Sequence, residues 1–215
     1  MPIPYGGWET IDRDEIVLRY APDHPQARGM REYAVRLEQA RAEICRRLDL
    51  EFEDPITVFV YKALDEGRAL TGGSLDFADP ENRRVHQRLE SYIGHEMVHV
   101  IAHTQLGYSG TGILGEGIAV WLNGQSPARH HARSAELRAA GELPSVRDLV
   151  ERFREQDAGY PAAGSFCGYL IDEHGLEVFK EIYPLDDPSE RLRELVDVGF
   201  EDLEPGWHAL LEKSR

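Results

Sequence analysis

Two histidines and a glutamate with the spacing of a metal site lie near the middle of the chain, in the segment His95-Glu96-Met97-Val98-His99. On an α-helix, residues four apart lie one turn above each other on the same face, so both imidazoles can point at one spot. Two imidazoles there form half of a tetrahedral zinc site, which in enzymes keeps one position open for water. Glu96 can lean toward that position and take a proton from the water. The spacing therefore predicts His95 and His99 as zinc ligands and Glu96 as a general base.

The residues around this motif have the apolar pattern of a buried helix. Between Leu89 and His103, apolar residues recur at positions 89, 93, 97, 100 and 101, which is the spacing of one helix face. Dry surroundings suit a metal site because they control the acidity of the water at the ion. We expect this helix to run from about Leu89 to His103.

A third ligand is predicted from the next segment. Residues 107–112 have the composition of a turn, and Thr111 or Ser109 could cap a second helix through Ile113–Leu122. Glu116 is the only acid in that apolar run. A charged group is rarely buried unless it is paired or bound to a metal, so Glu116 is the candidate. The glycines on either side of it would let this helix approach a neighbouring one closely.

These segments together resemble the gluzincin metallopeptidases, in particular their small peptidase-MA-like branch. The resemblance rests on His95-x-x-x-His99, on Gly115-Glu116-Gly117-Ile118-Ala119 and on Trp121. In that branch a glutamate on a second helix completes the zinc site, which implies this role for Glu116. This chain departs from the family pattern at Val120, because thermolysin-type members carry an aspartate four positions after the third ligand. The residue that positions Glu116 must therefore come from elsewhere in the chain.

A tyrosine is expected beside the zinc. Residues 160–176 are predicted to form a helix rich in small residues and ended by Gly175. The segment also resembles the one that, in peptidase-MA-like proteins, presents a tyrosine near the ion. Such a phenol can hydrogen-bond the oxyanion formed when water adds to a peptide carbonyl. Tyr160, at the mouth of the helix, is the first choice and Tyr169 the second; the alternative is that both are packed aromatic residues.

The segments before the motif predict a small sheet. Glu15–Tyr20 and Ile56–Tyr61 have the composition of strands, and Gln26–Leu48 that of a long amphipathic helix. A strand, helix and strand in this order usually place the two strands side by side and parallel. Residues 74–77 and 84–86 could form a hairpin, either an edge strand that binds extended substrate or an ordinary edge of the sheet. Further helices are expected at 128–140, from 144, and at 176–183, 188–198 and 203–213.

The fold class that follows is α+β and, by the resemblance, zincin-like. A small N-terminal mixed sheet with a long helix occupies about residues 1–105, and a largely helical part occupies about 106–215. The active-site cleft is expected between them, within a single catalytic domain spanning 1–215.

Composition limits the partners. A formal charge of −15 argues against nucleic acid and against anionic membranes, and no apolar run approaches the length of about 18 residues needed for a membrane span. The first residues lack the basic and apolar regions of a signal peptide. Cys45 and Cys167 are expected to be buried free thiols, in keeping with a reducing compartment. We expect a cytoplasmic protein with a peptide or protein substrate; the oligomeric state is not indicated.

His103 is not a candidate ligand, although it lies on the same face as His99. Eight residues of helix separate it from His95 by about 12 Å, whereas each ligand nitrogen must lie about 2.1 Å from one ion. Two functions remain open: a zinc-dependent endo- or aminopeptidase, and a non-catalytic zinc-fold or peptide-binding protein. Glu96 favours the peptidase, because a purely structural site has no need of a base.

Overall fold

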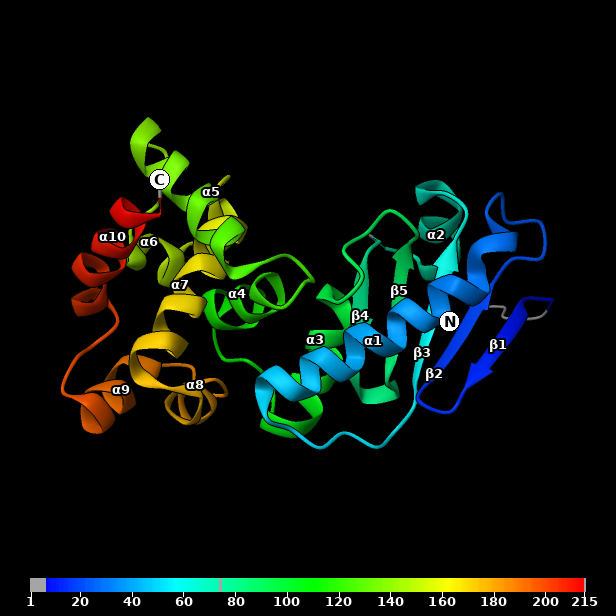
Figure 1. The fold of residues 1–215 in the computed structure, drawn as a ribbon, viewed down its shortest axis with the longest axis horizontal. Helices are drawn as coiled ribbons and strands as arrows, with labels where there is room; N and C mark the ends of the chain where they lie inside the picture. The colour runs from blue at the N-terminus through cyan, green and yellow to red at the C-terminus, as the bar shows by residue number, and fades with distance from the viewer. Residues whose placement is uncertain (1–6, 74, 215) are drawn as a thin grey trace. The chain divides into compact units, whose positions relative to one another are not determined.

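The computed structural model describes residues 7–73 and 75–214 and confirms the α+β class. The chain divides into two compact units, Met1–Gln105 and Leu106–Arg215. The first contains a mixed five-stranded sheet and the second is helical (Figure 1). The strands are β1 Glu9–Arg13, β2 Ile16–Tyr20, β3 Ile56–Tyr61, β4 Phe77–Asp79 and β5 Arg84–Arg88. The helices are α1 Met30–Leu48, α2 Leu64–Thr71, α3 His95–Leu106, α4 Gly112–Trp121, α5 Pro127–Ala140, α6 Val146–Glu151, α7 Gly159–His174, α8 Leu176–Ile182, α9 Pro188–Val196 and α10 Glu204–Lys213.

The sheet has the order β1-β2-β3-β5-β4. Its three inner strands β2, β3 and β5 are parallel neighbours, and both outer pairs are antiparallel. Helix α1 connects β2 to β3 and lies across one face of the sheet (Figure 1). The predicted strand, long helix and strand are therefore confirmed, including their parallel pairing.

Alternating burial explains which face of the sheet α1 covers. In β2, Ile16, Leu18 and Tyr20 are buried and the residues between them are not. Tyr33 of α1 is hydrogen-bonded to Gln87 of β5, with 2.5 Å between its hydroxyl and the amide nitrogen. Since successive side chains of a strand point to opposite faces, His86 lies on the face turned away from α1.

Three expectations about element bounds were wrong or incomplete. Strand β1 was not predicted, because four of its five residues are exposed and it lacks an apolar alternation. The hairpin is present, but β4 begins at Phe77 rather than at residue 74, and Ser74 lies outside the described residues. Helix α3 begins at His95, not at Leu89, because β5 continues to Arg88 and the next residues form turns.

His86 lies in a sandwich of aromatic rings on this second face. Its imidazole stacks on Phe77 of β4 and on Phe59 of β3, with centroids 4.5 and 4.9 Å away. The Tyr61 hydroxyl lies 2.8 Å from Nδ1 of His86. Burial among these rings penalises the charged imidazole and lowers the pKa of His86 to about 4. The side chain is therefore neutral at physiological pH and serves to pack the sheet.

We expect the buried His86 to make the protein sensitive to acid. In the unfolded chain its pKa is 6.5 and in the folded protein about 4, so between these values only the unfolded state binds a proton. The free energy of unfolding then falls as the pH falls through this window, by about 3 kcal/mol in total. Comparing urea unfolding of the wild type and His86→Phe from pH 7 to pH 4 tests this, because other titrating groups affect both. Parallel pH profiles would contradict the expectation.

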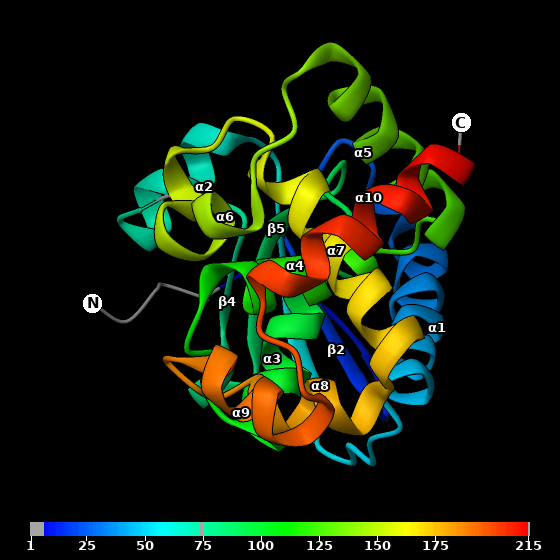
Figure 2. The ribbon, with the colours of Figure 1, turned by 90° about the vertical axis from the view of Figure 1, so that its left-hand side faces the viewer.

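Helix α7 is the centre of the helical unit. It packs against α4, α5, α8 and α10, and Figure 2 shows the last two of these beside it. Gly164 and Gly168 of α7 make the contact with α4 possible: a Cβ at these positions would lie 2.4 Å from side-chain atoms of Val120 and Trp121. Such distances leave no room for any residue larger than glycine.

Ser165 of α7 links three helices of this unit through its hydroxyl. Its Oγ accepts a hydrogen bond from Nε1 of Trp207 in α10 at 3.0 Å and lies 2.9 Å from Nδ1 of His131 in α5. All three residues are buried. Because Ser165 is completely shielded from solvent, this serine–histidine pair stabilises the unit and is not an accessible nucleophile.

Both thiols are free, Cys167 being buried as expected and Cys45 only partly so. Among the residues that the structure describes, no helix combines the length and the apolar character required to cross a bilayer.

Candidate metal centre

The two histidines of the motif lie at the start of α3. His95 is the first residue of the helix and His99 follows one turn later, so both imidazoles project from one face. Their ring centroids are 5.1 Å apart and the ring planes are 80° to each other. Met97, Val98, Val100 and Ile101 of the same helix have no exposed surface. The apolar side of α3 is therefore buried, and the histidines lie on its polar side.

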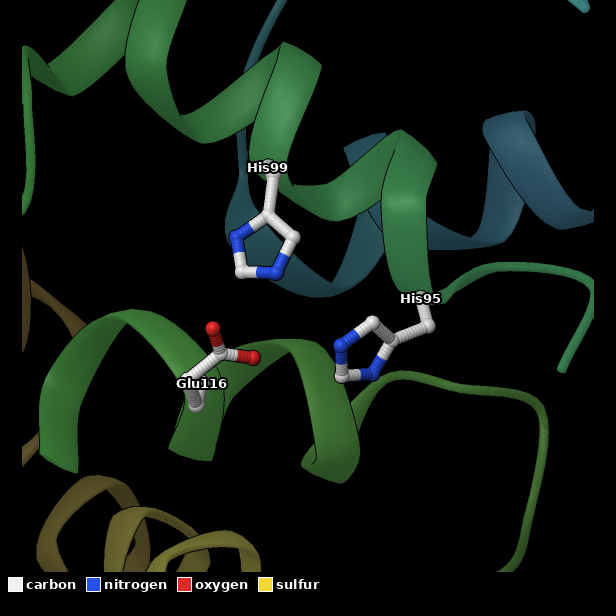
Figure 3. A group of neighbouring side chains, drawn as sticks. All are labelled: His95, His99 and Glu116. Carbon is white, nitrogen blue, oxygen red and sulfur yellow. The ribbon is translucent and has the colours of Figure 1, made fainter. Parts of the chain in front are cut away.

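Glu116 comes from the second turn of α4 and completes a group of three. One ligand atom each from His95, His99 and Glu116 lies within 4.8 Å of the other two. Figure 3 shows both imidazoles and the carboxylate facing one another. Within residues 7–73 and 75–214, this is the single group of at least three such side chains with metal-ligand spacing. The three predicted ligands are thus brought together.

The group fits a metal ion in both its chemistry and its dimensions. Two imidazole nitrogens and one carboxylate oxygen form the donor set of many catalytic zinc sites. In a tetrahedral site with such ligands the donor atoms lie about 3.4 Å apart. In the structure the three donor atoms are at most 4.8 Å apart. The side chains therefore need to move by only about 1 Å to reach the spacing of a tetrahedral site. Each member is partly exposed, so the group is not sealed from solvent.

Glu96 is the residue of α3 that follows His95 directly. Its side chain is only 9% exposed and it does not belong to the ligand group. The role of Glu96 as general base stays a prediction. His103 is likewise outside the group.

Close contact with α7 fixes the position of α4 at Glu116. A Cβ on Gly117 would lie 2.5 Å from the Cys167 sulfur and 2.7 Å from the Ala163 carbonyl oxygen. The Cys167 thiol also donates a hydrogen bond to the Ile113 carbonyl at 3.3 Å. The expectation that glycines beside Glu116 permit close helix packing is therefore confirmed at Gly117.

The start of α4 is held differently from the sequence-based expectation. Thr111 occupies the N-cap position, but its hydroxyl makes no capping hydrogen bond. The Ser109 hydroxyl instead donates to the Thr111 carbonyl at 2.8 Å. A Cβ on Gly110 would lie 2.2 Å from the Leu185 carbonyl oxygen, so the turn is pressed against the residues after α8.

The two candidate tyrosines lie in different surroundings on α7. Tyr160 is in the first turn, 50% exposed, with its ring 5.2 Å from that of Phe153 in an edge-to-face arrangement. Phe153 also packs against Gly112 at the start of α4, because a Cβ on Gly112 would lie 3.1 Å from its ring. Phe153 therefore lies between Tyr160 and the start of α4. The Tyr169 hydroxyl lies instead beside Gly206 of α10, 2.1 Å from the position that a Cβ on Gly206 would occupy. The role of Tyr160 as oxyanion donor stays a prediction.

One residue near the group was not singled out by the sequence. Tyr183 directly follows α8, is only 2% exposed, and interacts electrostatically with Glu116. Burial is the main cause that raises the pKa of its phenol, and Cys167 and then Glu116 contribute further. Nothing in the sequence around a tyrosine at the end of a short helix indicates which distant residues it will approach.

Neither a protein-family model nor a curated protein matches this chain. The chemistry of the residues themselves is therefore the only basis for assigning a function.

Proposed function

We propose that this protein is a zinc-dependent peptidase with a zincin-like catalytic domain of the gluzincin type. The observation that carries the proposal is the group of two imidazoles and one carboxylate, all within 4.8 Å of one another, with a second carboxylate next to it in sequence. A structural zinc site is normally closed by four protein ligands, often cysteines. A set of three with an adjacent acid is typical of a catalytic site.

Each residue has a separate part in the proposed reaction. Zn²⁺ held by His95, His99 and Glu116 would supply Lewis acidity, which lowers the pKa of water to about 7 and polarises a carbonyl. Glu96 would take the proton of the attacking water and pass it to the departing amine. The Tyr160 phenol would donate a hydrogen bond to the oxyanion.

The edge of the sheet offers a way to bind an extended peptide. In the described part of the chain, β4 pairs with β5 on one side and with no strand on the other. An edge of this kind can accept a further strand through main-chain hydrogen bonds. We therefore propose a peptide or protein substrate. The charge of −15 disfavours polyanionic partners, and the two free thiols fit the reducing conditions of the cytoplasm.

Metal content and peptide cleavage test this proposal together. We expect one zinc ion per chain after dialysis against metal-free buffer, and cleavage in a peptide library that stops with a chelator and returns with Zn²⁺. Glu116→Gln keeps the size of the side chain but removes its charge, and should lose zinc. The control is Glu177→Gln, which changes an exposed glutamate of α8.

Two outcomes would overturn the proposal. A wild-type protein without zinc would show that the group does not bind the ion. Zinc binding without cleavage of any library peptide would favour the non-catalytic zinc-fold protein instead.

A further inference from the structure

The sheet has an open strand edge at β1. This strand pairs with β2 on one side, and no strand of the described part of the chain lies on its other side (Figure 1). Four of its five residues are exposed. An edge of this kind carries a row of main-chain donors and acceptors, which form a template for a further strand. A strand that pairs there must match both these groups and the side chains beside them.

The hydrogen bonds of β2 show which main-chain groups of β1 point outward. An amide of β3 donates to the Glu15 carbonyl at 3.0 Å. The main-chain groups of successive strand residues point to opposite sides, so those of Glu15 face β3 and those of Ile16 face β1. Ile16 is paired with Arg13, and every second residue of β1 counted back from Arg13 therefore bonds to β2. The main-chain groups of Thr10 and Asp12 remain for the open edge.

A second copy of β1, running antiparallel, matches this edge in one register. Thr10 of each copy then lies opposite Asp12 of the other, and the outward main-chain groups of both residues form hydrogen bonds. The same register places Ile11 opposite Ile11 and Glu9 opposite Arg13. A two-fold axis relates the copies, so the pair of opposite charges forms twice. Apolar pairs and pairs of opposite charge across strands are both stabilising.

The two neighbouring registers that also bring the outward main-chain groups together are less favourable. One of them places Asp12 opposite Asp12, and like charges directly opposite each other destabilise a strand pair. The other places Glu9 opposite Ile11 and Arg13 opposite Gly7, so neither charge meets an opposite one. The order of charges along β1 therefore selects a single register.

The two charged side chains are already held on the face that α1 covers. Arg13 donates through Nε to Glu38 of α1 at 2.7 Å, and the Tyr20 hydroxyl donates to Glu9 at 3.0 Å. A guanidinium has five donor hydrogens and a carboxylate has two acceptor oxygens, so each keeps capacity for a bond across the edge. Because both side chains are restricted beforehand, they lose less freedom when the strands pair.

We propose that two copies of this protein associate through β1, as an antiparallel, two-fold symmetric strand pair centred on Ile11. The association joins the two five-stranded sheets into one. The contact consists of one five-residue strand from each copy, whereas stable interfaces bury about 1,200–2,000 Å². The dimer is therefore expected to be reversible and dependent on concentration. The inference goes beyond the proposed function and uses no residue of the metal group.

Sedimentation velocity of the full chain between about 10 μM and about 1 mM tests the inference. The wild type should shift from monomer toward dimer as the concentration rises. Glu9→Arg and Arg13→Glu should each raise the Kd of the dimer about 10-fold or more, because like charges then meet twice. An equimolar mixture of the two variants should recover the wild-type Kd, since two arginines of one copy face two glutamates of the other. A folding defect in either variant would not be repaired by mixing.

Thr10→Pro tests the main-chain pairing and leaves every charge in place. It removes the outward amide hydrogen of Thr10, and proline is tolerated on an edge strand where that hydrogen does not bond within the sheet. Dimerisation should be lost. The matched control is Thr10→Ala, which keeps the amide and should dimerise as the wild type does. Glu53→Arg, at an exposed position between α1 and β3, is the control for the charge reversals and should leave the Kd unchanged.

Three results would overturn the inference. The first is a wild type that stays monomeric over the whole range of concentration. The second is a dimer that Thr10→Pro leaves intact, or a mixture of the charge variants that associates no better than either alone. The third is growth beyond the dimer, which would indicate that β1 pairs with the β4 edge of a next copy, a head-to-tail contact that does not close.

Discussion

Replacing Glu96 by alanine is expected to remove peptide hydrolysis and to leave one zinc ion bound per chain. Glu96 directly follows His95 in sequence but does not belong to the group of three proposed ligands, so its loss should not weaken metal binding. A positioned general base contributes about 10²–10⁴-fold to the rate, and kcat/KM on a cleaved library peptide should fall by that amount. Elemental analysis of the same sample checks the zinc.

The matched control for this variant is Glu90→Ala. Glu90 precedes α3 and is exposed, so its removal changes the charge near the helix without removing the base. Activity and zinc content should both equal those of the wild type. Loss of zinc together with activity in Glu96→Ala would show that Glu96 is a ligand and that its assignment as base is wrong.

The candidate site was largely predictable because its residues are close in sequence and follow helix geometry. His95 and His99 are four residues apart, which places them on one face wherever the helix forms. Glu116 was identified by its isolation in an apolar run. Both arguments use only local periodicity and the cost of burying a charge, and neither depends on how distant segments pack.

Element bounds were less predictable where apolar spacing was ambiguous. Leu89 and Ile93 have the i, i+4 spacing of a helix, yet they lie in turns between β5 and α3. Strand β1 was missed for the opposite reason, because it lacks the apolar alternation of a strand. Its residues are mostly exposed, and pairing with β2 rather than an apolar pattern makes it a strand.

Tyr183 could not have been found from local patterns. It lies more than sixty positions after Glu116, and only the packing of the turn at 109–111 against the end of α8 brings it close. Contacts of this kind depend on tertiary structure, which a single sequence does not specify by spacing.

Replacing Tyr160 by phenylalanine is expected to lower kcat far more than it changes KM. A phenol that reaches the oxyanion only after water has added to the carbonyl stabilises the transition state and not the bound substrate. Removing one oxyanion donor costs about 10²–10³-fold in rate. The phenylalanine ring can keep the edge-to-face contact with Phe153, and the tyrosine is half exposed, so the thermal stability should stay the same.

Tyr169→Phe separates this role from that of an ordinary aromatic residue. The Tyr169 hydroxyl lies beside Gly206 of α10, so its removal should leave kcat unchanged and affect at most the stability of the helical unit. A drop in kcat for Tyr169→Phe, with Tyr160→Phe silent, would transfer the oxyanion role to Tyr169. If both variants kept the wild-type kcat, neither phenol would contact the reacting carbonyl, and both tyrosines would be packing residues.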